Sequence, residues 1–120
     1  MSWTRLRRLL RPILAATFYR LGAERTILRG PGRGLRYRIF PDYGLSPVWG
    51  GWEGRAQRLM VRHIPSGSTA FDIGASYGVH TLLLARLVGA HGRVYAFEPD
   101  PVSFSQLCRH VTLNGLNDTG

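Results

Sequence analysis

The sequence contains no lysine and only one cysteine, and these absences exclude several kinds of site. All 16 basic residues are arginine, so the chain cannot contain a phosphate-binding P-loop, which needs a lysine after its glycines. A single cysteine, Cys108, rules out an internal disulfide. The histidines show no ligand spacing with cysteine or with acids, which predicts that there is no metal site; they are His63, His80, His91 and His110.

Long apolar runs and internal repeats are also missing. The apolar stretch after Pro12 is interrupted at Arg20, well short of the ~20 residues that a membrane-spanning helix needs. The same interruption argues against a cleaved signal. We therefore expect a cytoplasmic protein. A chain of 120 residues permits one small domain.

Acidic residues are scarce in the amino-terminal half. Residues 1–62 carry 13 arginines against Glu24, Asp42 and Glu53, a net charge of +10, whereas residues 63–120 carry a net charge of −1. This asymmetry suggests an anionic partner or surface. The alternative is compositional bias, because exclusive use of arginine points to a GC-rich coding sequence.

Residues 3–21 have an apolar stripe at helical spacing with most arginines elsewhere. This pattern is typical of a helix that lies on an anionic membrane surface. Pro12 weakens the prediction because proline inside a helix costs ~3 kcal/mol. The alternative is a segment that packs on the domain. Peripheral membrane contact through residues 1–21 therefore stays open beside the cytoplasmic prediction.

Two short apolar runs, each ending in an acid, form the most informative pattern. Residues 69–73 and 93–97 read as strands, and residues 79–88 between them read as an apolar helix. Asp72 and Glu98 stand where these strands end, and Gly74 and Gly78 bracket the first loop. The order predicts an α/β fold whose parallel strands deliver polar loops to one ligand-binding edge.

A second helix follows with clear boundary signals. Asp100 suits the N-cap, Pro101 the first helical position and Gly115 the C′ position. Four apolar residues at i, i+3, i+4 and i+7 predict one buried stripe, with Cys108 as a buried thiol: Phe104, Leu107, Cys108 and Val111.

The chain before the first strand divides into three parts. Residues 28–40 read as a small β-hairpin, because glycines cluster in its turn and Leu35 to Ile39 alternate at period two. Residues 43–54 are aromatic and glycine-rich, either a packed loop or a flap over the ligand. A lead-in helix is expected from Ala56 to His63. We thus divide the chain into a basic amphipathic segment (1–29), a hairpin, loop and helix region (30–64), and the start of a cofactor-binding domain (65–120).

The acids favour an adenosine-containing ligand. Glu98 lies 20 residues after Gly78, where an acid can accept hydrogen bonds from both ribose hydroxyls. Asp72 could meet a cationic amino group or, more simply, cap the helix or bind loop N–H groups. A dinucleotide fingerprint fails, because Ser76 and Val79 stand where its second and third glycines belong. An NAD-dependent oxidoreductase is therefore the weaker alternative.

The segment Asp72–Leu82 resembles the first motif of FkbM-type S-adenosylmethionine-dependent methyltransferases, D-[IV]-G-A-N-x-G-x-x-[ST]-L. Phe97-Glu98-Pro99 resembles their acidic second motif, and Asn114-Gly115-Leu116 a common N-G-L. Gly51-Trp52-Glu53 resembles the G-x-[YW]-E element that precedes the domain. The resemblance covers about Gly30 to Asp118.

The family resemblance implies an incomplete class I, Rossmann-like domain that binds S-adenosylmethionine and methylates oxygen, with a sugar or secondary-metabolite hydroxyl as acceptor. The Gly74–Gly78 loop, including Ala75 and Ser76, would wrap the methionine part, with Asp72 supporting the loop or the amine. Glu98 would hold the ribose, the backbone at Pro99 and Asp100 would border adenine, and Glu53 would approach the amine.

Two departures from the family are visible. Ser76 replaces the usual Asn, which would remove any contact made by an amide side chain. The family's later strands and acceptor segments have no counterpart before Gly120, so we expect a fragment or a piece that needs a partner, with its catalytic base elsewhere. The remaining alternatives are a catalytically incomplete chain and a basic membrane-surface module. No feature specifies a nucleic acid, and the oligomeric state is open.

Overall fold

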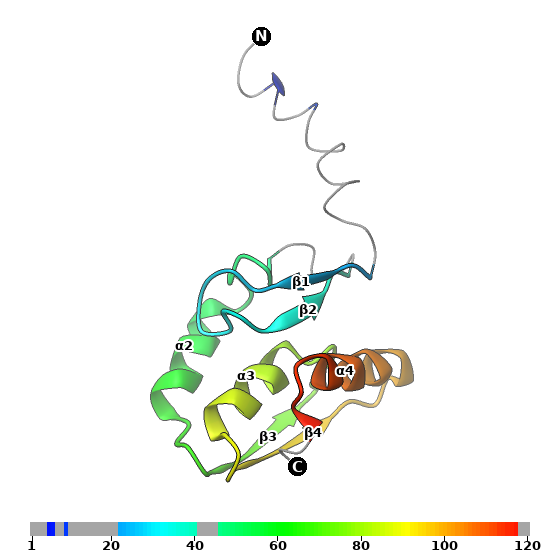
Figure 1. Cartoon of the computed structure of the whole chain (residues 1–120). Coiled ribbons are helices and arrows are strands. Elements are labelled where there is room, and N and C mark those ends of the chain that lie inside the picture. Colours follow the sequence, from blue (N-terminus) through cyan, green and yellow to red (C-terminus); the bar gives the residue numbers. More distant parts are fainter. Residues whose placement is uncertain (1–4, 7–8, 10–21, 41–45, 118–120) are drawn as a thin grey trace.

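The structure, a computed structural model, describes residues 5–6, 9, 22–40 and 46–117. Four strands and three helices follow one another in this part of the chain: β1 (Glu24–Thr26), β2 (Arg36–Arg38), α2 (Gly54–His63), β3 (Thr69–Ile73), α3 (Val79–Val88), β4 (Arg93–Phe97) and α4 (Pro101–Leu113). The chain has an α/β fold with a small parallel sheet and flanking helices (Figure 1).

The predicted strand–helix–strand unit is confirmed. β3 and β4 pair in parallel, with Asp72 opposite Ala96 and Ile73 opposite Phe97. Parallel strands cannot be joined by a tight turn, and α3 provides the crossover between them. The turn at residues 89–92 ends α3 before β4 begins.

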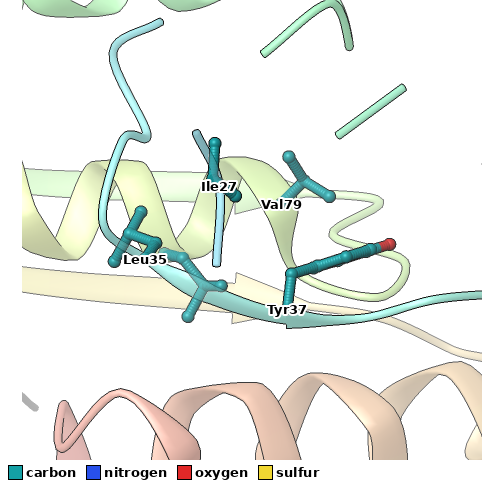
Figure 2. Close-up of a cluster of buried hydrophobic side chains, with 5 residues drawn as sticks. Ile27, Leu35, Tyr37 and Val79 are labelled. Atoms are coloured by element: carbon teal, nitrogen blue, oxygen red, sulfur yellow. The ribbon is translucent and has the colours of Figure 1, made fainter. Parts of the chain in front are cut away.

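Helix α3 is the centre of the molecule and lies between the hairpin and the parallel sheet (Figure 1). Its residues are buried on nearly every side, which explains its apolar sequence. One side meets the hairpin, where Ile27, Leu35, Tyr37 and Val79 point into a shared cluster (Figure 2). The other side meets Ala70 of β3 and Val94 of β4.

The predicted hairpin is present. β1 and β2 pair antiparallel, and the alternation from Leu35 to Ile39 buries the apolar residues against α3. β1 lies wholly before the expected start at Leu28, so the predicted range of residues 28–40 was too short and missed the first strand. The hairpin therefore crosses the sequence-based boundary between residues 29 and 30.

The boundary signals of α4 are confirmed. Asp100 accepts a hydrogen bond from the Ser103 N–H at 2.8 Å, Pro101 occupies the first turn, and Gly115 adopts φ 65° just after the Asn114 C-cap.

The predicted buried stripe of α4 is partly wrong. Leu107 is buried, but Cys108 is exposed and Phe104 is 46% exposed. The helix face that packs inward differs by about one residue position from the predicted one. His110 accepts a hydrogen bond from the Arg38 N–H and Asn114 accepts one from the Arg36 N–H, and these bonds turn that face toward the hairpin. Cys108 therefore lines an open groove beside β4 rather than the core.

One face of the parallel sheet carries exposed large apolar residues, three of them aromatic. Phe71, Ile73, Tyr95 and Phe97 are between 43% and 75% exposed, and the Phe71 ring stacks on those of Tyr95 and Phe97. In the described part of the chain, α3 covers only the opposite face. Parallel sheets are ordinarily covered on both faces.

The lead-in helix is confirmed as α2, and residues 46–53 form a packed turn with Val48 and Pro47 buried. This favours the packed-loop interpretation over a flap for the described part of that loop; residues 43–45 lie outside it. Most of the amphipathic segment 3–21 also lies outside the described residues, apart from Arg5, Leu6 and Leu9. Among the helices that are described, none is long and apolar enough to cross a membrane.

Candidate functional site

The two acids predicted at the strand ends come to the same edge of the sheet. Asp72 is paired in register with Ala96, and Glu98 follows two residues later on the same alternating face. That face is the one covered by α3. The loop of residues 74–78 passes between the two acids, so the structure brings the predicted site together.

Backbone hydrogen bonds fold this loop over the end of β4. The N–H groups of Gly74 and Ala75 both donate to the carbonyl of Phe97, at 2.9 and 3.0 Å. Gly74 and Gly78 both have positive φ, 76° and 90°, which glycine adopts without strain. A Cβ at Gly74 would point into open space, whereas one at Gly78 would lie 3.1 Å from Leu107. Gly78 therefore serves close packing, while Gly74 faces the open side of the site.

Glu98 holds the loop through its carboxylate. Oε2 accepts from the Ser76 N–H at 2.7 Å and Oε1 from the Asp100 N–H at 2.9 Å. A carboxylate has about four lone-pair sites, so each oxygen keeps one acceptor position. Glu98 can thus fix the loop and still accept ribose hydroxyls.

Asp72 is hydrogen-bonded to a side chain of α3, and this contact is neither the helix cap nor the loop N–H bond that the sequence suggested. Its Oδ2 accepts from the Thr81 hydroxyl at 2.5 Å. Half-buried carboxylates are costly unless they are hydrogen-bonded, and this bond accounts for part of that cost. The remaining lone pairs can still meet a cationic amine.

A small pocket of about 150 Å³ opens beside the loop. Five of the expected site residues line it: Asp72, the loop residues Gly74, Ala75 and Ser76, and Glu53 from the start of α2. The full lining is Trp52, Glu53, Asp72, Gly74, Ala75, Ser76, Tyr77, Val79 and His80. Glu98 is outside this lining. The site therefore has two parts, a pocket at Asp72 and an open edge at Glu98.

Two residues of the pocket have left-handed backbone conformations that side chains other than glycine rarely adopt. They are Glu53 at φ 43° and Ser76 at φ 51°. Strain of this kind concentrates at functional sites. Asn tolerates this conformation better than Ser does, which gives a backbone reason for the Asn that Ser76 replaces in the resembling family.

Pro99 and Asp100 lie exposed at the open edge. The side chain of Asp100 is engaged as the N-cap, and its hydrogen bonds with Ser103 lower the pKa of the Asp100 carboxyl. Only its backbone is left for a ligand.

His110 supports the loop of residues 74–78 through a hydrogen bond to its backbone. Its Nδ1 lies 2.6 Å from the Tyr77 carbonyl, and its Nε2 accepts from the Arg38 N–H at 3.1 Å. Because Nε2 accepts, the proton sits on Nδ1 and is donated to Tyr77. The ring stacks on Tyr37 at 4.5 Å, and burial lowers the pKa of His110.

The sequence interpretation missed His80 and His110. His80 is an ionisable residue in the first turn of a mostly apolar helix, and that position is the signal that could have revealed it. His110 is a fully buried polar residue on the inward side of α4. Within the described residues, no three metal-ligating side chains come together.

Comparison with solved structures identifies the fold. A protein from Clostridium thermocellum assigned as an rRNA methylase superposes with a TM-score of 0.54 and 27% identity, over 55% of this chain and 36% of that one. An S-adenosylmethionine-dependent methyltransferase from Aquifex aeolicus gives a TM-score of 0.47 and 25% identity, over 52% of this chain and 34% of that one.

The matched part of this chain thus spans about a third of the length of those structures. No family model matches the sequence, and no curated protein is similar enough to count as a relative. The fold is the Rossmann-like fold of S-adenosylmethionine-dependent methyltransferases.

Proposed function

We propose that the chain is the cofactor-binding part of an S-adenosylmethionine-dependent methyltransferase. The observation that carries the proposal is the meeting of Asp72, the Gly74–Gly78 loop and Glu98 at one edge of a parallel sheet. The methyltransferase fold of the neighbouring structure supports the same cofactor.

The residues present fit the two ends of this cofactor. The pocket at Asp72 and Glu53 is acidic and small, which suits an ammonium group. Glu98 stands at the open edge with acceptor positions left for ribose hydroxyls. Gly74 leaves open space for the backbone to approach a ligand. Pro99 and Asp100 offer backbone at the border expected for adenine.

The bound cofactor supplies an electrophilic methyl group on its sulfonium. This chain's contribution is to bind and orient it: Glu98 fixes the loop through Ser76, and Asp72 is held by Thr81. Positioning two reactants in line can contribute ~7–11 kcal/mol to lowering a barrier.

We further propose that the methyltransferase is of FkbM type and that it transfers the methyl group to an oxygen atom. These proposals are supported by the first motif at Asp72–Leu82 and by Glu98-Pro99, and a sugar or secondary-metabolite hydroxyl is the corresponding acceptor class. Activity by this chain alone is likewise a proposal.

Calorimetric titration with S-adenosylhomocysteine, with NADH as the comparison ligand, tests the cofactor class. We expect the first to bind and the second not to bind. Asp72→Ala and Glu98→Ala should each weaken binding about tenfold or more, since each removes hydrogen bonds to a charged group. Glu24→Ala is the matched control, because it removes an exposed acid on the hairpin.

Circular dichroism of each variant separates lost binding from lost fold. Unchanged affinity in both folded variants would contradict the site assignment. Selective binding of NADH would point instead to an oxidoreductase.

A nucleic acid is a second candidate acceptor. Arg55, Arg58 and Arg62 share the outer face of α2 at helical spacing and are exposed. None of them forms an ion pair with a described acid, and the Clostridium protein is assigned to rRNA. Clustered arginines that face outward suit a phosphate backbone.

Salt-dependent binding to a single-stranded RNA tests this candidate. Replacing the three arginines by Gln should flatten the slope of log affinity against log salt by roughly 2, at about 0.7 per phosphate contact. Arg93→Gln with Arg109→Gln is the control. An unchanged slope would remove the α2 face from the candidate.

Membrane contact through residues 1–21 is proposed separately from catalysis. Deleting these residues should reduce co-sedimentation with anionic vesicles and leave S-adenosylhomocysteine binding unchanged. Equal sedimentation of the full chain and the shortened chain would contradict this proposal.

A further inference from the structure

We propose that His80 binds the carboxylate of the methionyl group of S-adenosylmethionine. This inference rests on the proposed function and assigns a role to a residue that neither the motif nor the fold assigns. It starts from the size of the pocket, the unmet hydrogen bond of His80 and the charges around it.

The pocket can enclose only one end of the cofactor. Its volume of about 150 Å³ is well below the ~300–1,000 Å³ of pockets that enclose a whole drug-sized ligand. Glu98, the expected ribose ligand, lies outside its lining. The end that enters the pocket is therefore the amino-acid end, which carries an ammonium and a carboxylate.

His80 has a ring nitrogen that lacks a hydrogen bond in this pocket. Nε2 is buried and makes none, although it lies 3.0 Å from Oε2 of Glu53. The two atoms are close enough for an ion pair but form no hydrogen bond. Leaving a buried polar atom without a partner costs about 1–3 kcal/mol, and a ligand acceptor placed near Nε2 would remove that cost.

The charges around the pocket complement an α-amino acid. Glu53 and Asp72 provide negative charge for the ammonium. His80 stands in the first turn of α3, where amide N–H groups have no partner inside the helix and the helix dipole favours an anion. His80 and this helix end therefore form the part of the pocket that suits the carboxylate.

Two ligands separate the amino-acid end from the nucleoside. S-adenosylhomocysteine carries the carboxylate, and 5′-methylthioadenosine lacks the amino-acid group. His80→Ala should weaken S-adenosylhomocysteine binding about tenfold, the value of one charge-assisted hydrogen bond, and leave 5′-methylthioadenosine binding within about twofold. His80→Gln, which restores an N–H donor, should recover part of the lost affinity.

Glu98→Ala is the contrasting variant, because the ribose is common to both ligands and both should weaken. Calorimetry on the full chain gives the affinities, with circular dichroism as the check of folding. If wild type binds both ligands and Glu98→Ala weakens both, the proposed function stands whatever His80 does.

When wild type binds both ligands and Glu98→Ala weakens both, three results overturn the role of His80. They are an unchanged affinity of His80→Ala for S-adenosylhomocysteine, an equal loss for both ligands, and no recovery in folded His80→Gln. If the folded wild-type chain binds neither ligand, the proposed function fails and this inference fails with it.

Discussion

Replacing His110 by Phe should destabilise the protein and remove part of its pH dependence. His110 is fully buried and links three segments: it donates to the Tyr77 carbonyl and accepts from the Arg38 N–H. Phe keeps a flat ring for stacking on Tyr37 but can make neither of these two hydrogen bonds.

The size of the effect follows from those two groups. Each unmet, partly buried polar group costs about 1–3 kcal/mol, and both lie where water can partly reach them, so we expect about 3 kcal/mol in total. For a domain of this size that corresponds to a fall in Tm of roughly 10 °C. Thermal unfolding followed by circular dichroism measures it. His91→Phe is the control, because His91 lies exposed in the turn before β4.

The pH dependence has a definite sign. Burial lowers the pKa of His110 below its usual 6.5; the Tyr77 carbonyl opposes this, Arg38 lowers the pKa further and Glu24 raises it. The unfolded chain therefore binds the proton more readily. The stability contributed by neutral His110 is complete above pH 6.5 and is lost as the pH falls below 6.5 and through the lowered pKa. An equal pH slope in wild type and His110→Phe would refute this reasoning.

Three further changes test other parts of the structure. Ser76→Asn should raise the free energy of unfolding by about 0.5 kcal/mol, and with it the urea midpoint, because Asn adopts positive φ more readily. A lower midpoint would mean that the contacts of the serine hydroxyl contribute more to stability than the backbone conformation does. Cys108 should react with a thiol reagent in the folded chain at a rate near that of a free thiol, and protection until unfolding would contradict its exposure. Asp100→Ala should lower Tm at neutral pH but not in acid, since the pKa of Asp100 is lowered and its capping contribution is lost as the pH falls through that value; Asp100→Asn, which keeps a capping acceptor, should change Tm less.

Local signals in the sequence were enough to predict the strand–loop–helix unit. β3, α3 and β4 fall where apolar runs and glycines place them, and the Asp100 cap follows from side-chain chemistry within one turn. These features depend on neighbours in the chain. The meeting of Asp72 and Glu98 was also predictable, because parallel strands end at one edge.

Features set by long-range packing were not predictable. The inward side of α4 is decided by His110 and Asn114 binding backbone groups of β2, more than 70 residues earlier, whereas apolar spacing alone pointed to Cys108. The approach of Glu53 Oε2 to His80 Nε2 at 3.0 Å likewise brings the start of α2 to the start of α3. Neither polar contact leaves a periodic signal in the sequence.

These long-range contacts give the amino-terminal hairpin a role in the site. The hairpin holds His110 through Arg38, and His110 holds the loop through the Tyr77 carbonyl. Phe40 stacks on the Tyr77 ring at 4.3 Å from the same side. Glu98 holds the next loop residue, Ser76, from the opposite side. The loop is thus held at Ser76 by Glu98 and at Tyr77 by His110, and a loop fixed in advance would lose less entropy in the binding that we propose. The hairpin therefore supports the loop through Arg38 and Phe40, although it contributes no residue to the pocket.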